Sequence, residues 1–222
     1  AFKPFETLPH CVDVVTNLDK TGVDRMFTAI NAEVRRRQQL NVETDTKDIV
    51  EYRKKGYHLS KGAYPHLFII IDEYAEMIDD NPDYRAALES ITRVGRSVGL
   101  NLVLASQRPK GVSDQMRANI KLRLCLRVED ADTSRELLRR PDAALLPSGQ
   151  PGRGYLQVGG DTIELIQVGF AGVETDQINA KGENVRFFEA AVALASSLNK
   201  GAMAARPWPA FLPQELSLES PV

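Results

Sequence analysis

Two adjacent carboxylates, Asp72 and Glu73, directly follow an apolar run that spans Leu67 to Ile71. The run is too short for a helix, so it predicts a strand buried on both faces, as in a parallel sheet covered by helices. Such sheets bind ligands at the carboxyl ends of their strands. An acidic pair there suits nucleotide hydrolysis, in which Asp72 would hold Mg²⁺ directly or through a water and Glu73 would orient and deprotonate the attacking water. The alternative is a core strand whose Asp72 only caps the next helix.

A second predicted strand, over Leu100 to Ala105, has Gln107 just beyond its carboxyl end. An amide side chain can donate and accept hydrogen bonds at once, which suits a residue that senses a phosphate or the attacking water. On its own, Gln107 is equally a polar residue that caps a loop. If the two strands are neighbours, Gln107 lies beside Asp72 and Glu73.

Strands and helices alternate through the centre of the chain, so the predicted class is α/β with a mainly parallel sheet. The alternation over 121–128 predicts a strand near the sheet edge, with leucines on one side and a polar side formed by Lys121, Arg123, Cys125 and Arg127. A hairpin is expected about Gly159 and Gly160, between 155–158 and 162–168. The other predicted elements are a strand over 11–16 and helices over 22–40, 48–54, 81–99 (capped by Asn81), 113–119, 132–139 and 184–198.

The composition narrows the class of protein. The formal net charge of −2 argues against a stand-alone nucleic-acid binder, which usually has a basic surplus. Cys11 and Cys125 provide no disulfide framework, and Cys125 is expected to be a buried thiol. The three histidines have no cysteine at zinc-binding spacing. No apolar segment approaches the length of a membrane span, so any membrane attachment is expected outside these residues.

Several long motifs carry a family resemblance. The string Gly95-Arg96-Ser97-Val98-Gly99-Leu100-Asn101-Leu102-Val103-Leu104-Ala105-Ser106-Gln107-Arg108-Pro109 closely resembles the FtsK/SpoIIIE ATPase domain, as do Leu8-Pro9-His10 and Arg117-Ala118-Asn119-Ile120. Pro151-Gly152-Arg153-Gly154-Tyr155 and Pro141-Asp142-Ala143 narrow this to the EccC/EssC ATPases of type VII (ESX) secretion. The resemblance covers most of residues 5 to 172. Tyr74 departs from it, since the secretion members usually have Phe at that position.

The resemblance implies a RecA-like P-loop NTPase core that uses ATP and Mg²⁺, with Asp72 on the metal, Glu73 as the base and Gln107 as the sensor. Arg96 resembles the arginine finger that reaches into a neighbouring subunit's site, and Arg25 and Arg153 are weaker candidates. The alternative for Arg96 is a cation at a helix end, favoured by the helix dipole. The sequence contains no Gly-x-x-x-x-Gly-Lys-[Ser/Thr], and in the family this phosphate loop lies upstream of the matching region. Residues 1–200 therefore resemble the later part of an ATPase domain, residues 201–222 read as a Pro-rich linker towards a following domain, and the fragment alone is expected to be inactive.

The function implied is an ATPase motor module in the cytoplasmic part of a membrane-anchored type VII secretion translocase that exports small helical proteins. Its expected partners are ATP, other ATPase modules of the same chain or neighbouring subunits, the secretion membrane complex and the exported proteins. Two alternatives stay open: a DNA translocase of the FtsK type, which shares Asp72, Glu73 and Gln107, and a regulatory nucleotide-binding module with little hydrolysis. The negative net charge and the segment that includes Arg153 favour secretion over DNA translocation.

Overall fold

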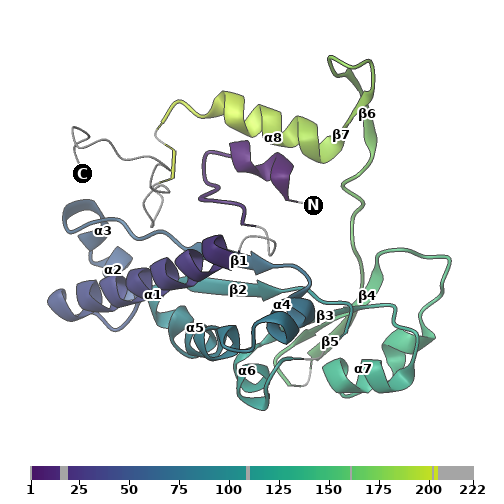
Figure 1. The fold of residues 1–222 in the computed structure, drawn as a ribbon, viewed down its shortest axis with the longest axis horizontal. Helices are drawn as coiled ribbons and strands as arrows, with labels where there is room; N and C mark the ends of the chain where they lie inside the picture. The colour runs from purple at the N-terminus through teal and green to yellow at the C-terminus, as the bar shows by residue number, and fades with distance from the viewer. Residues whose placement is uncertain (1, 16–19, 109–110, 161, 202, 205–222) are drawn as a thin grey trace. The chain divides into compact units, whose positions relative to one another are not determined.

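A computed structural model of the protein describes residues 2–15, 20–108, 111–160, 162–201 and 203–204 (Figure 1). The chain divides into two compact units, one formed by Ala1–Ile30 with Phe188–Val222 and the other by Asn31–Phe187. Asp72, Glu73, Arg96 and Gln107 all belong to the second unit.

The strands β1 (Leu67–Ile71) and β2 (Leu100–Leu104) form a parallel pair, where the apolar runs predict strands (Figure 1). Leu67 pairs with Leu100 and Ile71 pairs with Leu104, so the two strands end at the same edge. The hydrogen-bond ladder continues past this edge, since the Ala105 N–H donates to the Ile71 carbonyl at 2.8 Å. This register brings the residues that follow β1 beside those that follow β2.

The helix α5 (Tyr84–Val98) packs against β2 and leads directly into it. Its end depends on two glycines. Gly99 has φ +70°, and a Cβ there would collide with the end of the Ile49 side chain, so this position favours glycine. A Cβ on Gly95 would lie 2.8 Å from the Leu100 carbonyl oxygen, so glycine allows helix and strand to approach closely. As the helical spacing predicts, the buried face of α5 consists of Tyr84, Leu88, Ile91, Gly95 and Val98.

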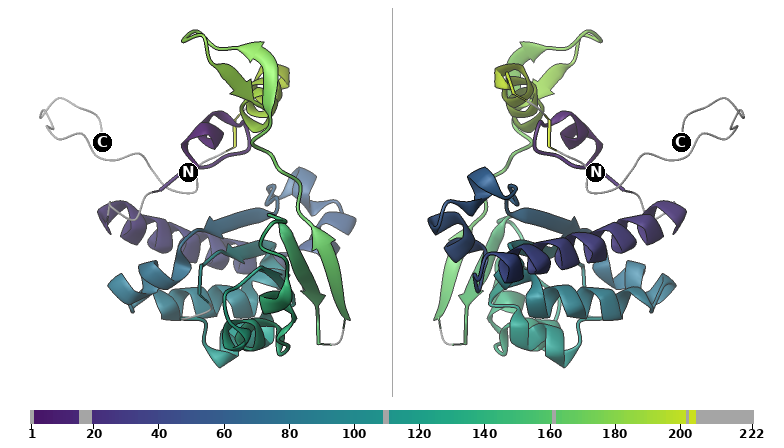
Figure 2. Two further views of the ribbon diagram at one scale, coloured as in Figure 1. Left: turned by 90° about the vertical axis from the view of Figure 1, so that its right-hand side faces the viewer. Right: turned by 90° about the vertical axis from the view of Figure 1, so that its left-hand side faces the viewer.

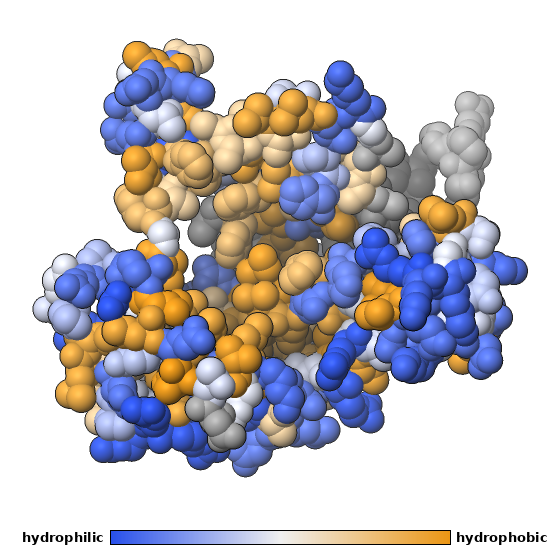
Figure 3. All heavy atoms as spheres, turned by 180° about the vertical axis from the view of Figure 1, so that it is seen from behind, coloured by the Kyte–Doolittle hydropathy of each residue, from blue (hydrophilic) through white to orange (hydrophobic). Residues whose placement is uncertain are grey.

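The expectation that the first strand is buried on both faces is wrong for the part of the chain that the structure describes. Phe68 is 63% exposed, Ile70 is 57% exposed and Val103 on β2 is 46% exposed. Figure 3 shows apolar side chains gathered at the molecular surface on the rear face. An unbroken apolar run shows that the segment is hydrophobic, but it does not show whether other residues cover each face of the strand.

A second sheet is antiparallel and consists of β3 (Leu122–Leu126), β4 (Arg153–Val158) and β5 (Thr162–Gln167). Its hairpin β4–β5 confirms the turn predicted at Gly159 and Gly160. Cys125 is buried, as expected, and packs with Leu138, Ala143 and Leu146 from the segment that holds α7 (Ala131–Leu138) and η2 (Asp142–Leu145). Figure 2 shows this sheet with α7 beside it.

The alternation in β3 divides the side chains between the two faces of the strand as predicted. The side predicted to be polar, which includes Cys125, is the covered one. The leucine side is open, and Leu122, Leu124 and Leu126 are 63%, 49% and 45% exposed. The helix α6 (Asp114–Asn119), capped by Ser113, precedes this strand, as predicted.

A buried polar cluster, formed by Glu33, Arg37, Asn41 and Tyr64, joins α1 (Lys20–Glu43) to the end of α5. Arg37 Nε donates to Glu33 Oε1 at 2.6 Å and Arg37 Nη1 donates to the Val98 carbonyl at 2.9 Å. The Arg37 guanidinium lies 5.2 Å from the centre of the Tyr64 ring, and the Tyr64 hydroxyl donates to Asn41 Oδ1. Beside this cluster lie α2 (Ile49–Lys54) and α3 (Tyr57–Ser60).

The first unit contains η1 (Lys3–Thr7) and most of α8 (Phe187–Leu198). The Phe5 and Phe188 rings lie 5.9 Å apart, and Ser196 Oγ donates to the Thr7 carbonyl at 2.9 Å. These contacts join the two ends of the described chain within that unit.

Three predicted elements differ from the structure. Residues 11–15 form no strand, and Thr16 lies outside the described residues. The helix expected from Asn81 begins at Tyr84, because Asn81 instead ends α4 (Tyr74–Asp80). The helix expected from Asn184 begins at Phe187, and the preceding residues form a hairpin of β6 (Glu174–Ile178) and β7 (Asn184–Arg186). Most of the predicted linker, 205–222, lies outside the described residues.

Candidate functional site

Glu73 and Gln107 meet at the carboxyl edge of β1 and β2. Gln107 Nε2 donates a hydrogen bond to Glu73 Oε1 at 2.8 Å, although 34 residues separate them in sequence. The parallel register of the strands places them there. Gln107 therefore does not simply cap its own loop, since its amide binds the carboxylate on the neighbouring strand end.

The backbone at Glu73 is left-handed, with φ 50° and ψ 45°. For a residue with a Cβ this conformation costs on the order of 1 kcal/mol, and such residues cluster at functional sites. Two hydrogen bonds support it: Asp72 Oδ1 accepts from the Glu73 N–H at 3.1 Å, and the Tyr74 N–H donates to the Ala105 carbonyl at 2.9 Å. The turn directs the Glu73 side chain towards Gln107.

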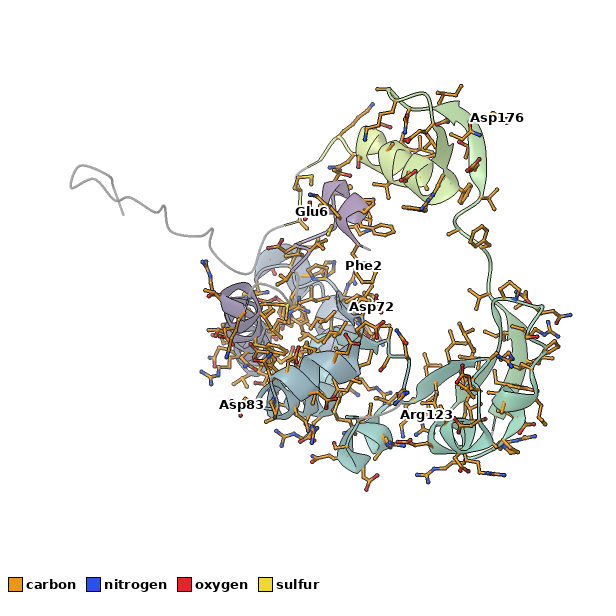
Figure 4. The ribbon with its side chains drawn as sticks, turned by 45° about the vertical axis from the view of Figure 1, so that its right-hand side comes forward. Phe2, Glu6, Asp72, Asp83, Arg123 and Asp176 are labelled. Atoms are coloured by element: carbon orange, nitrogen blue, oxygen red, sulfur yellow. The ribbon has the colours of Figure 1, made fainter. Side chains whose placement is uncertain are left out.

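Asp72 does not cap α4. The N-cap position of that helix is Glu73, which makes no capping hydrogen bond, and among the residues that the structure describes the Asp72 carboxylate accepts only from the adjacent Glu73 N–H. Figure 4 marks Asp72 at the carboxyl end of β1, where its side chain is exposed. The strand end therefore leaves at least one carboxylate oxygen free for a ligand.

The Asp72 carboxylate is the kind of ligand that binds Mg²⁺ in nucleotide sites. No group of three or more His, Cys, Asp or Glu side chains able to hold a metal occurs among the described residues. Mg²⁺ in phosphate-transfer sites needs no such cage, since one or two carboxylates, waters and the substrate phosphates complete its octahedron. One exposed carboxylate beside a carboxylate–amide pair fits that donor set.

Arg96 lies at the opposite end of the strand pair from Asp72, Glu73 and Gln107. It is in the last turn of α5, which leads into the amino end of β2, and the five residues of β2 span roughly 16 Å. That span is longer than an arginine side chain, so Arg96 does not reach the Glu73–Gln107 pair of its own chain. Its side chain is exposed and makes no hydrogen bond or ion pair with any residue that the structure describes.

Tyr74 also belongs to this edge, although the sequence did not indicate it. Tyr74 is fully buried, and its hydroxyl donates to the Gly111 carbonyl at 2.9 Å. Its departure from the secretion-family pattern was the available signal, but the sequence could not show which group the hydroxyl meets.

Comparison with known proteins identifies the family. The model of the FtsK/SpoIIIE family matches residues 1–143. This chain belongs to the FtsK/SpoIIIE family. Type VII secretion system protein EssC of Staphylococcus aureus (strain NCTC 8325 / PS 47) is 42% identical over 188 residues, which cover 82% of this chain and 13% of EssC. ESX secretion system protein EccC of Geobacillus thermodenitrificans (strain NG80-2) is 39% identical over 177 residues, 77% of this chain and 12% of EccC.

A solved structure agrees with the family. The cytoplasmic domain of the type VII secretion ATPase EccC of Thermomonospora curvata matches 95% of this chain with a TM-score of 0.81 and 30% identity, and the match covers 24% of that structure. This FtsK/SpoIIIE chain thus has the α/β fold of P-loop ATPases, as the sequence predicts, and resembles the EccC/EssC ATPases most specifically. Within the described strands, the pair β1–β2 is parallel and the other pairs are antiparallel.

The chain spans about an eighth of the length of the curated relatives it matches, at 13% and 12% of EssC and EccC. No helix in the described part of the chain combines the length and the apolar character needed to cross a membrane.

Proposed function

We propose that this chain belongs to an ATPase motor module of a membrane-anchored type VII secretion translocase, in which ATP binding and hydrolysis drive export of small helical proteins. The contact between Glu73 and Gln107 at the shared edge of β1 and β2 is the observation that carries the proposal. The likeness to EssC and EccC supports the secretion class. Its partners would be ATP with Mg²⁺, other ATPase modules, the membrane complex and the exported proteins.

The proposed roles follow from the geometry of the edge. Glu73 Oε2 is left to accept a proton from the attacking water, because Gln107 binds Oε1. The Gln107 amide has a second N–H and a carbonyl oxygen, with which it can contact the γ-phosphate or that water while it still holds Glu73. Asp72 would bind Mg²⁺, which neutralises charge on the phosphates.

The first experiment replaces the base in the complete protein. Glu73→Gln should leave ATP binding nearly intact and slow hydrolysis by roughly 10²–10⁴-fold, because it removes the proton acceptor. The measurements are steady-state phosphate release and equilibrium nucleotide binding. Glu76→Gln, an exposed carboxylate on α4 three residues away, is the matched control and should stay within a few-fold of wild type.

Two outcomes would favour the alternatives. Turnover of Glu73→Gln within a few-fold of wild type would contradict the catalytic role and support a regulatory nucleotide-binding module. Strong stimulation of wild-type hydrolysis by double-stranded DNA would support a DNA translocase of the FtsK type.

We also propose that residues 1–200 are the later part of an ATPase domain whose phosphate loop lies upstream, with 201–222 as a linker. The exposed faces of β1, β2 and β3 support this, because apolar sheet faces are normally covered in α/β domains. Residues 1–222 alone should then show no saturable binding of ATP at micromolar concentration in a calorimetric titration. A tight one-to-one site in that titration would contradict the domain assignment.

A further inference from the structure

Tyr74 makes hydrogen bonds to the backbone on both sides of Gln107 in the sequence. Its backbone N–H donates to the Ala105 carbonyl at 2.9 Å, two residues before Gln107. Its side-chain hydroxyl donates to the Gly111 carbonyl at 2.9 Å, four residues after Gln107. Tyr74, which directly follows Glu73 in the sequence, therefore binds the backbone before and after Gln107, the residue whose side chain binds Glu73.

The hydrogen bond between the Tyr74 hydroxyl and the Gly111 carbonyl, called the tie below, lies among closely packed side chains. The ring is fully buried, and the hydroxyl lies 3.6 Å from Met116 Sδ on α6, a second fully buried side chain. Gly111 has φ +85°, and a Cβ there would lie 3.3 Å from Tyr74 Cε1, so the Gly111 backbone packs directly against the ring. Burial raises the pKa of the Tyr74 hydroxyl, which therefore keeps its proton and stays a donor at neutral pH.

We propose that Tyr74 is a positioning residue for the Glu73–Gln107 pair, whose hydroxyl holds Gly111 so that the Gln107 amide stays within hydrogen-bonding distance of the Glu73 carboxylate. The inference rests on the proposed function for its catalytic consequence, but the tie itself is a property of the fold. The parallel ladder fixes the Ala105 side, and any residue at position 74 with a backbone N–H provides that contact. On the Gly111 side, the hydrogen bond to the carbonyl requires the tyrosine hydroxyl, while the ring packs against the Gly111 backbone and Arg117 Nε donates to the Val112 carbonyl at 3.2 Å.

The test is Tyr74→Phe in the complete protein, with Tyr52→Phe as the matched control. Tyr52 is equally buried, and its hydroxyl also donates to a glycine carbonyl, that of Gly62 at 2.8 Å, but it lies in the aromatic cluster beside Tyr64 rather than at the strand edge. Both variants keep the ring and lose a hydrogen bond to a glycine carbonyl, and Tyr74→Phe also loses the 3.6 Å contact of the hydroxyl with Met116 Sδ. The two changes should therefore have similar effects on the melting temperature and different effects on the site.

Hydrogen exchange measures the tie without reference to activity. Tyr74→Phe should raise the exchange rate of amides in a peptide from Leu104 to Arg117 by several-fold, and Tyr52→Phe should leave that peptide unchanged. Unchanged exchange in Tyr74→Phe, or an equal rise in both variants, would overturn the proposal.

Kinetics measure the consequence for Glu73 and Gln107. Tyr74→Phe should lower kcat by about 3- to 10-fold, the worth of one hydrogen bond, with the KM for ATP within about two-fold of wild type. In single-turnover assays this loss should disappear in a Gln107→Ala background, because the hydroxyl acts through Gln107. A purely structural tyrosine would cause the same fold-loss in both backgrounds, and that result would overturn the positioning role.

The two proposals fail differently. A complete wild-type protein that hydrolyses no ATP would contradict the proposed function, and the exchange experiment would still decide whether the tie exists. An active enzyme that Glu73→Gln inactivates, and in which Tyr74→Phe changes neither exchange nor kcat, would overturn the tie and leave the function standing.

Discussion

The carboxyl edge of β1 and β2 and the buried polar cluster at the end of α1 use charged side chains in opposite ways. In the cluster, Arg37 has partners on three sides, namely Glu33, the Val98 carbonyl and the Tyr64 ring. At the edge, Asp72 accepts only from the adjacent backbone within the described part of the chain, and Gln107 occupies one oxygen of Glu73.

This difference separates the residues expected to stabilise the fold from those expected to act in hydrolysis. Buried polar groups are costly unless they are satisfied, so the cluster must use its hydrogen bonds within the fold. The edge groups are exposed or half-buried, so solvent can reach the atoms that the protein leaves without a partner. Substitutions in the cluster should therefore change the free energy of unfolding, and substitutions at the edge should change hydrolysis.

The largest effect is expected at Arg96, an exposed cation in the last turn of α5, which belongs to neither region of the comparison. If Arg96 is the arginine finger that the family resemblance implies, Arg96→Ala should lower hydrolysis in the assembled protein by roughly 10³–10⁵-fold and leave nucleotide affinity of the monomer unchanged, because such a finger acts on the site of a neighbour. The measurement is phosphate release by the assembled form. Arg93→Ala, on the same helix and also exposed, should be nearly silent.

A mixing experiment shows whose site Arg96 serves. Arg96→Ala and Glu73→Gln subunits should each be nearly inactive alone, but a mixed assembly would contain some sites where an intact Glu73 faces an intact Arg96. Partial recovery of hydrolysis supports action between subunits. No recovery, or a nearly silent Arg96→Ala, would remove Arg96 from the catalytic machinery.

The next effect concerns Arg37, the centre of the cluster. Arg37→Met should lower the free energy of unfolding by about 2–3 kcal/mol, because it removes charge-assisted hydrogen bonds and leaves the Val98 carbonyl without that donor. Arg36→Met is the matched control: Arg36 binds the same Glu33 but its side chain is 46% exposed, so about 0–1 kcal/mol is expected. Denaturant unfolding measures both, and equal losses would contradict the distinction between buried and exposed pairs.

The cluster also predicts a pH dependence. Burial raises the pKa of the Glu33 carboxyl, but the hydrogen bonds and charges of Arg36 and Arg37 outweigh it, and the folded-state pKa lies below the usual value. A depressed carboxyl pKa adds stability that is present above the unfolded pKa of about 4.3 and is lost as the pH falls through the folded value. The difference in stability between wild type and Arg37→Met should therefore shrink below about pH 4.

The smallest effect is expected at Tyr64, and it tests whether loss of a tyrosine hydroxyl in the cluster differs from its loss at Tyr74. Tyr64→Phe removes the hydroxyl that donates to Asn41 and keeps the ring that lies 4.5 Å from Tyr52. It should cost about 1 kcal/mol of unfolding free energy and leave kcat unchanged. A fall in kcat comparable to that expected for Tyr74→Phe would show that the cluster and the edge are coupled.

The sequence by itself determined the two strands, their direction and their polar ends. The apolar runs predicted β1 and β2, and Glu73 and Gln107 were expected to meet if those strands were neighbours. It also predicted α5 with Gly99 at its end, and the hairpin at Gly159 and Gly160. These features follow from local causes, such as periodicity, turn chemistry and the backbone freedom of glycine, which a sequence displays directly.

Tertiary structure alone decided which faces are covered and which distant groups meet. The alternation in β3 shows that the leucines share a side, but it was the packing of Leu138 and Ala143 that covered the side of Cys125. The run in β1 could not reveal that Phe68 is exposed. The tie between Tyr74 and Gly111 spans 37 residues, and the separation of Arg96 from the edge is the length of β2. These are long-range properties, because they depend on how elements pack in space, and no local pattern of residues encodes them.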